Sequence, residues 1–157
     1  MSQRIRYPRV NPAAYRAMAA MQAYVDRTNL EPELLELVKL RASYMNGCAF
    51  CVDMHTKDAR AAGESEQRLY AVPVWRETPF FTPRERAALA WTEAVTDLGR
   101  SHVPDDVYQE ARAHFEEAEL VDLTLCVIAI NGWNRLAVSF RSDVGSYRPR
   151  ESAEVAS

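Results

Sequence analysis

The sequence has few glycines and no long run in which apolar and polar residues alternate. Only 5 of its 157 residues are glycine, and alternation, the pattern of a half-buried strand, never extends beyond a few positions. Apolar residues instead recur three and four positions apart, which is the spacing of an amphipathic helix. These features exclude a β-rich fold and predict an all-α protein.

The chain also lacks an excess of positive charge and a membrane-length apolar run. It has 19 Lys and Arg against 22 Asp and Glu, a formal net charge of −3, so no basic surface for nucleic acid is expected. No apolar run follows the basic residues 1–10, so no signal peptide is expected. The strongly apolar stretch 120–130 contains Asp122 and is too short to span a bilayer. We therefore expect a cytoplasmic protein with no membrane or nucleic-acid partner.

The length is typical of one domain, for which roughly 100–200 residues is the usual range. We see no internal repeat and no low-complexity segment. The expected domain covers residues 1–157, with an ordered core over about 12–141 and a polar C-terminal tail over 142–157. Residues 1–10 are expected to be extended, because Pro8 disfavours a helix there.

Start and stop signals divide the core into six to seven helices. Asn11-Pro12 and Thr82-Pro83-Arg84-Glu85 are start signals, because Asn and Thr cap a helix and proline fits its first position. Asn46-Gly47 and Gly63 are stop signals, because these residues tolerate the left-handed conformation of a C-terminal cap. The expected helices span about 12–28, 32–46, 48–62, 65–75, 83–98, a segment beginning at 104, and 119–140.

The last of these helices is apolar on nearly every side, as in the buried centre of a bundle or a subunit interface. Its polar residues Asn131 and Asn134 would need hydrogen-bond partners if buried. The helix and several large aromatic residues offer more apolar surface than one small bundle needs to bury (Trp91, Trp133 and Phe140). We therefore expect a homo-oligomer.

The stretch 36–63 combines the residue types of a redox site. Cys48 and Cys51 lie three positions apart at the start of a predicted helix, and His55 follows one turn later, so all three share one stripe of that helix. The helix N-terminus favours a thiolate over a thiol through its free N–H groups and partial positive charge. Glu36 lies on the preceding helix, which a two-residue break turns back against this one.

These residues satisfy the requirements of a thiol nucleophile with a base, an orienting group and a second thiol. His55 can accept the Cys51 proton, while Glu36 can orient or charge the imidazole, or draw the proton through a water. A thiolate attacks the O–O bond of a peroxide and becomes a sulfenic acid, which Cys48 can convert to a disulfide. An outside dithiol, which the sequence does not identify, must then reduce that disulfide by exchange.

The motif resembles that of the AhpD-like alkylhydroperoxidases of the carboxymuconolactone decarboxylase superfamily. Glu36 lies twelve residues before Cys48-Ala49-Phe50-Cys51, His55 lies four beyond it, and residues 130–138 are similar to the final helix of that group. The resemblance covers about residues 12–141. It implies an all-α fold that forms trimers or hexamers and a thiol-dependent peroxidase with no bound cofactor. By matching positions, Cys51 would attack hydrogen peroxide or an organic hydroperoxide, Cys48 would resolve the product, and Glu36 and His55 would form the proton relay.

One residue departs from the best-known members, which carry a second histidine between the two cysteines where this chain has Phe50. The relay would then run through a water or Tyr44. The decarboxylases of the superfamily lack the cysteine pair, so the resemblance does not favour lactone decarboxylation.

The cysteine pair is also compatible with two other interpretations. A structural zinc site usually takes four ligands from two such pairs, and the further candidates are carboxylates, His102, His114 and Cys126, so we expect no metal. Cys126 lies in an apolar run and is expected to be a small core residue. The dithiol could also belong to a redox sensor or disulfide-exchange protein without peroxide turnover, and that alternative stays open.

Overall fold

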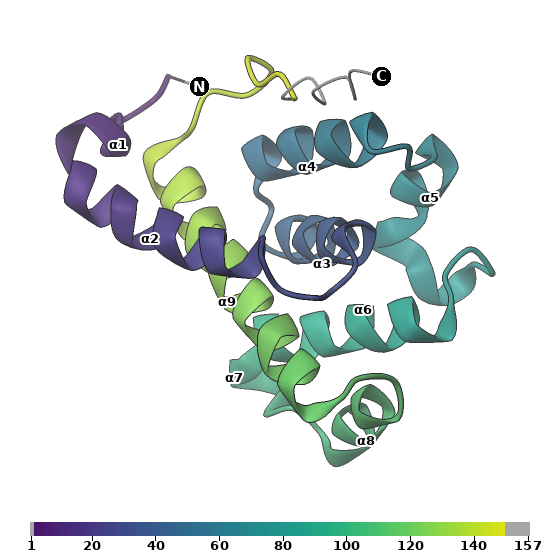
Figure 1. Ribbon diagram of the computed structural model, residues 1–157. Coiled ribbons are helices and arrows are strands. Elements are labelled where there is room, and N and C mark those ends of the chain that lie inside the picture. The colour runs from purple at the N-terminus through teal and green to yellow at the C-terminus, as the bar shows by residue number, and fades with distance from the viewer. Residues whose placement is uncertain (1, 150–157) are drawn as a thin grey trace, which may run out of the picture.

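The computed structural model describes residues 2–149, which contain helices and connecting segments but no strand (Figure 1). Within that range, seven α-helices have six or more residues: α2 (Pro12–Val25), α3 (Pro32–Met45), α4 (Ala49–Ala61), α5 (Glu66–Ala71), α6 (Pro83–Thr96), α8 (Asp105–His114) and α9 (Glu117–Phe140). Single turns form α1 (Tyr7–Val10) and α7 (Leu98–Ser101), and the 3-10 helix η1 covers Val72–Glu77. The predicted all-α bundle is confirmed.

The helix boundaries follow the signals in the sequence. The Thr82 hydroxyl accepts the Glu85 N–H at 3.2 Å, and the Glu85 carboxylate accepts the Thr82 N–H at 2.7 Å, which completes a capping box. Asn11 caps α2 through the Ala14 N–H at 3.1 Å. Gly47 and Gly63 have φ values of +62° and +100°, where a side chain would be strained, so both stop signals are confirmed.

The N-terminal segment corrects one expectation. Residues 7–10 form the turn α1 rather than an extended segment, with Pro8 in the first turn of the helix. Proline is tolerated there because the first N–H groups of a helix have no partner within it. The expectation of an extended segment was therefore wrong at these four positions.

Helix α9 is the long packing element of the bundle and contacts α2, α3, α4, α6 and α8 (Figure 1). It has 24 residues, and its most apolar 18-residue window has a mean hydropathy of 1.3, so length and composition alone would allow it to cross a membrane. The helix predicted over 119–140 agrees with these bounds, but its apolar window is longer than the stretch 120–130 that was judged too short to span a bilayer. Because 44% of that window is buried against the other helices, we interpret α9 as a core helix.

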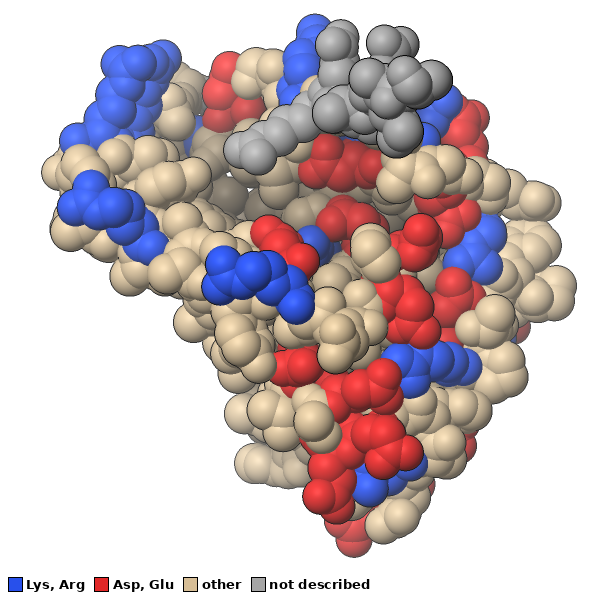
Figure 2. All heavy atoms as spheres, in the orientation of Figure 1, with Lys and Arg blue, Asp and Glu red and all other residues tan. Residues whose placement is uncertain are grey.

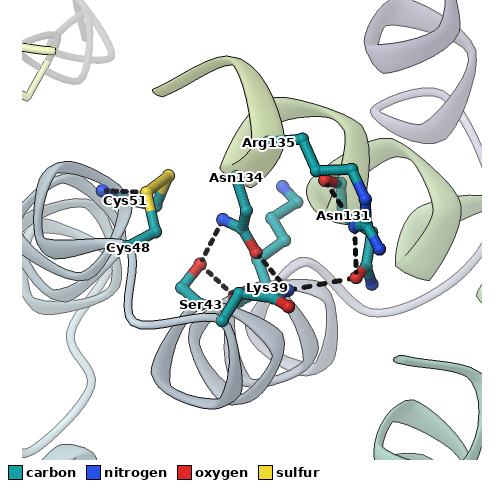
Figure 3. Close-up of a disulfide and its surroundings, with 8 residues drawn as sticks. Lys39, Ser43, Cys48, Cys51, Asn131, Asn134 and Arg135 are labelled. Atoms are coloured by element: carbon teal, nitrogen blue, oxygen red, sulfur yellow. Dashed lines mark hydrogen bonds between the residues drawn. A yellow bond between two sulfur atoms is a disulfide. The ribbon is translucent and has the colours of Figure 1, made fainter. Parts of the chain in front are cut away.

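The buried polar side chains of α9 find partners at the end of α3 (Figure 3). Asn134 is 1% exposed; its amide nitrogen donates to the Ser43 hydroxyl at 3.1 Å, and its oxygen accepts from the Asn46 amide at 2.9 Å. The Asn46 amide also reaches the Asn131 oxygen at 3.0 Å, and Ser43 donates to the Lys39 carbonyl at 2.7 Å. This network fixes α9 against the turn that leads into Cys48.

The described part of the C-terminal tail, residues 142–149, lies along α4 (Figure 1). The Gly145 N–H donates to an Asp53 carboxylate oxygen at 3.2 Å, and the Lys57 ammonium donates to the Tyr147 carbonyl at 3.2 Å. The Tyr147 hydroxyl donates to Asp58 at 2.7 Å. The rest of the predicted tail, 150–157, lies outside the described residues.

Candidate redox site

Cys48 and Cys51 are joined by a disulfide at the start of α4 (Figure 3). Cys48 is the N-cap residue of the helix, and its sulfur accepts the Cys51 N–H at 3.3 Å. Their Cα atoms lie 5.3 Å apart, a separation that one turn at a helix start supplies. The predicted position of the cysteine pair at a helix N-terminus is confirmed.

The two cysteines lie in a small apolar cluster between α4 and α9. Each cysteine is 1% exposed, and the pair packs with Ala137 of α9 and the partly buried Phe50. Thiol–disulfide exchange requires the attacking thiolate to reach a sulfur atom. An outside dithiol can therefore react with this disulfide only after the surrounding side chains open locally.

His55 lies on α4 one turn after Cys51 and is 6% exposed. Its Nδ1 atom lies 2.9 Å from Oε2 of Glu36, which comes from α3. An ionised carboxylate can only accept a hydrogen bond, so Nδ1 donates and the neutral imidazole keeps its lone pair on Nε2. Nε2 is buried and has no hydrogen-bond partner among the described residues. That tautomer and that open acceptor are what a general base requires.

Glu36 is held on its other side by Lys39, whose ammonium lies 2.8 Å from Oε1. Burial raises the pKa of Glu36, but the hydrogen bond and charge of His55, together with Lys39, outweigh it and lower the pKa to about 2. Burial also lowers the pKa of Lys39, and the Glu36 carboxylate outweighs that effect and raises it. Glu36 and Lys39 are therefore both ionised at neutral pH.

The structure joins the predicted site residues in pairs. Cys48 and Cys51 form a disulfide at the start of α4, and Glu36 of α3 is hydrogen-bonded to His55 of α4, which packs against α3. Their roles in catalysis stay a prediction. Lys39 was missed, although its position one turn after Glu36 on a largely apolar helix was a usable signal.

The other residues considered from sequence lie elsewhere. Tyr44 packs against a separate apolar cluster around Leu37 and Leu40. His114 pairs with Glu110 on α8 at 3.2 Å. Cys126 is a free thiol in the main core, and burial raises its pKa to about 12, so its assignment as a core residue is confirmed.

One group of side chains near the relay could hold a cation. Donor atoms of Glu36, His55 and Asp58 lie within 4.8 Å of one another. The Lys39 ammonium already supplies a positive charge to Glu36, and the His55 Nδ1 atom that faces Glu36 is engaged with that carboxylate. Because this ammonium would repel a divalent ion placed at Glu36, we assign no metal to this group.

Comparisons with known proteins agree on family and fold. The sequence profile of the carboxymuconolactone decarboxylase family matches residues 12–94, which include the four predicted site residues. YdfG, an uncharacterised protein of Bacillus subtilis, is 42% identical over 146 residues, which cover 93% of this chain and 99% of YdfG. ATU0492 of Agrobacterium tumefaciens, described as a protein of unknown function and a candidate antioxidant defence protein AhpD, is 46% identical with a TM-score of 0.91 over 93% of this chain and 100% of that chain. The debrominase Bmp8 shares the fold at 19% identity and a TM-score of 0.78, over 87% of this chain and 73% of that chain.

Proposed function

The chain belongs to the carboxymuconolactone decarboxylase family, and we propose that it is a thiol-dependent peroxidase of the AhpD-like type. The observation that carries the proposal is the bonded pair Cys48–Cys51 on the same helix as His55, whose unpartnered Nε2 can accept a proton. A reversible dithiol supplies two electrons, which is the number that reduction of one peroxide consumes. Decarboxylation would have no use for this pair.

The proposed cycle begins with the reduced protein. His55 Nε2 takes the Cys51 thiol proton, and the thiolate attacks one oxygen of the peroxide ROOH. An S–O bond forms while the O–O bond breaks, and the leaving alkoxide takes the proton from His55 and departs as the alcohol ROH. Cys51 is then a sulfenic acid and has been oxidised by two electrons.

Cys48 completes the oxidative half of the cycle. Its sulfur attacks the Cys51 sulfenic sulfur, the S–S bond forms, and the hydroxyl group leaves with the Cys48 proton as water. An external dithiol then reduces the disulfide through a mixed-disulfide intermediate and becomes oxidised itself. This last step suits a reducing compartment, and for that reason we propose the cytoplasm as the location.

We expect sustained turnover when reduced protein is mixed with cumene hydroperoxide and excess dithiothreitol. With one equivalent of peroxide and no reductant, the thiol count after denaturation should fall from three to one per chain, because Cys126 remains free. Peroxide consumption is followed by a colorimetric assay and thiols by titration. A count that stays at three after minutes would contradict the peroxidase proposal.

A redox sensor is the second candidate, and the burial of the disulfide favours it. Both cysteines are 1% exposed, and restricted access slows reduction by a protein dithiol. A sensor and a peroxidase give the same thiol count after one equivalent of peroxide. They differ in the presence of reductant, because the sensor oxidises once whereas the enzyme consumes many equivalents per chain.

We also propose that the protein is a homo-oligomer, and the resemblance to the AhpD-like proteins implies a trimer or a hexamer. Val121 and Ile128 lie seven residues apart on one side of α9 and are 67% and 48% exposed. In the face shown in Figure 2, basic side chains gather over the α1–α2 arm and acidic ones over the α8 end. The basic end of one copy therefore carries the opposite charge to the acidic end of another copy. Light scattering after size exclusion should give an oligomeric mass at micromolar concentration, and a monomer would contradict the proposal.

A further inference from the structure

A buried lysine adjoins the proposed proton relay. Lys39 is 7% exposed, and its ammonium contacts Glu36 Oε1 at 2.8 Å and lies 3.9 Å from a carboxylate oxygen of Asp26 at the end of α2. Burying an ammonium costs free energy unless it is paired. An apolar residue at this position of α3 would pack without that cost. Packing of the core therefore does not account for the charge of Lys39, and we look for its role in the redox site.

Glu36 is engaged on both of its oxygens. Oε1 accepts from Lys39, and Oε2 lies 2.9 Å from His55 Nδ1. A carboxylate held at both ends cannot rotate without losing a charge-assisted hydrogen bond, each of which is worth roughly twice a neutral one. The orientation of the His55 ring therefore depends on a residue that does not touch it.

We propose that Lys39 is a positioning residue of the redox site proposed above: its ammonium holds Glu36 as a fixed acceptor for His55 Nδ1, so that His55 Nε2 takes the Cys51 proton. This inference rests on the proposed function only for the identity of the reacting thiol. In this arrangement Glu36 orients the base and does not itself store the proton. Lys39 acts through Glu36 and does not contact the reacting atoms.

The charges around Lys39 come from several elements. Glu36 faces it from α3 and Asp26 from the end of α2, while Cys126 of α9 is close enough to interact electrostatically. Burial keeps the Cys126 thiol neutral at ordinary pH. On the other side of Glu36 lie His55 and Asp58 of α4. Lys39 is thus a cation between two carboxylates, and its removal leaves Oε1 of Glu36, whose side chain is 18% exposed, without this donor.

That loss has a chemical consequence. A buried carboxylate with one unpaired oxygen either takes up a proton or turns away to find another donor. In both cases Nδ1 of His55 loses its fixed acceptor, and Nε2 is no longer held as the proposed acceptor of the Cys51 proton. Removing the lysine should therefore make the Cys51 thiol harder to deprotonate.

The test measures Cys51 alkylation by iodoacetamide as a function of pH in the reduced full-length protein, with a Cys48→Ser substitution in every sample so that the reacting thiol is defined. We expect Lys39→Met to move the midpoint of the pH profile up by about one unit, and Lys39→Arg to restore it. Lys57→Met is the matched control, because Lys57 pairs with Asp53 of the same helix α4 and does not contact Glu36. An unchanged midpoint in Lys39→Met, or failure of Lys39→Arg to restore it, would overturn the inference.

A fourth variant, Lys39→Gln, keeps a hydrogen-bond donor without the charge. We expect it to shift the midpoint in the same direction as Lys39→Met, and it replaces that variant if the methionine does not fold. Because alkylation needs no peroxide, the two proposals fail separately. A shifted pH profile without peroxide turnover would contradict the peroxidase proposal and support the role of Lys39. Peroxide turnover with an unshifted profile would support the peroxidase proposal and contradict the role of Lys39.

Discussion

Cys51→Ser should abolish peroxide turnover, with a loss of at least about 10³-fold, because a serine hydroxyl is not ionised at neutral pH and cannot replace a thiolate nucleophile. Cys48→Ser should instead block formation of the intramolecular disulfide. In the absence of added thiol, its Cys51 would react once with peroxide and would then stay as a sulfenic acid, since the resolving thiol is absent. Dimedone trapping followed by mass spectrometry should find that acid in Cys48→Ser and not in Cys51→Ser.

The assignment of the attacking sulfur is a real choice, because two effects compete. Cys48 is the N-cap of α4, and its sulfur accepts the Cys51 N–H at 3.3 Å, a contact that would stabilise a thiolate at Cys48. Cys51 instead lies one turn before His55, whose Nε2 has no hydrogen-bond partner among the described residues. Only a base can both remove the thiol proton and return it to the leaving alkoxide, so we favour Cys51.

The third cysteine provides a control for the dimedone experiment, and the opposite labelling pattern would contradict the assignment of the two cysteines. Cys126→Ala removes the third thiol from the core, where its pKa of about 12 keeps it protonated, and should leave turnover unchanged. If dimedone instead labels Cys48 in the Cys51→Ser variant, while Cys48→Ser gives no label, then the roles of the two cysteines are exchanged.

Local signals account for most of what could be predicted from the sequence. The caps at Asn11 and Thr82 and the stops at Gly47 and Gly63 are interactions between residues a few positions apart, so they are visible in the chain itself. The stripe of cysteines and histidine on α4 is likewise set by helical spacing. Glu36 required the further inference that two helices fold back on each other, which the two-residue break at Asn46-Gly47 indicated.

Contacts between distant segments could not be predicted in the same way. Lys39 is a typical surface residue by type, and its burial depends on how α9 and the end of α2 close over α3. Asn134 was expected only to need partners, because Ser43 and Asn46 lie about 90 residues earlier in the chain. The path of residues 142–149 along α4 depends on backbone contacts such as the Gly145 N–H, for which no residue pattern exists.

Glu36→Gln should lower peroxide turnover by about 10²-fold or more, because a neutral amide cannot stabilise the imidazolium that forms when His55 takes the Cys51 proton. The amide is nearly the same size, so a loss of this magnitude would come from charge rather than packing. Glu33→Gln is the matched control: it makes the same substitution on the same helix at an exposed position. Equal turnover in the Glu36→Gln variant and the wild type would remove Glu36 from the relay.

The same pair of variants tests the electrostatics without any peroxide. The folded pKa of Glu36 is about 2, below its ordinary value of 4.5, so its ionised form stabilises the fold above about pH 5 and that contribution is lost as the pH falls toward 2. The contribution is on the order of 3 kcal/mol at neutral pH. In urea unfolding of the oxidised protein, the difference in unfolding free energy between wild type and Glu36→Gln should therefore be largest at pH 6–7 and smaller by about 2 kcal/mol at pH 3.

The corresponding difference for the control Glu33→Gln should stay small at every pH, because an exposed carboxylate interacts almost equally in the folded and unfolded states. If the difference in unfolding free energy between wild type and Glu36→Gln does not change with pH, then His55 and Lys39 do not hold the carboxylate ionised. That result would contradict the proposed roles of both His55 and Lys39.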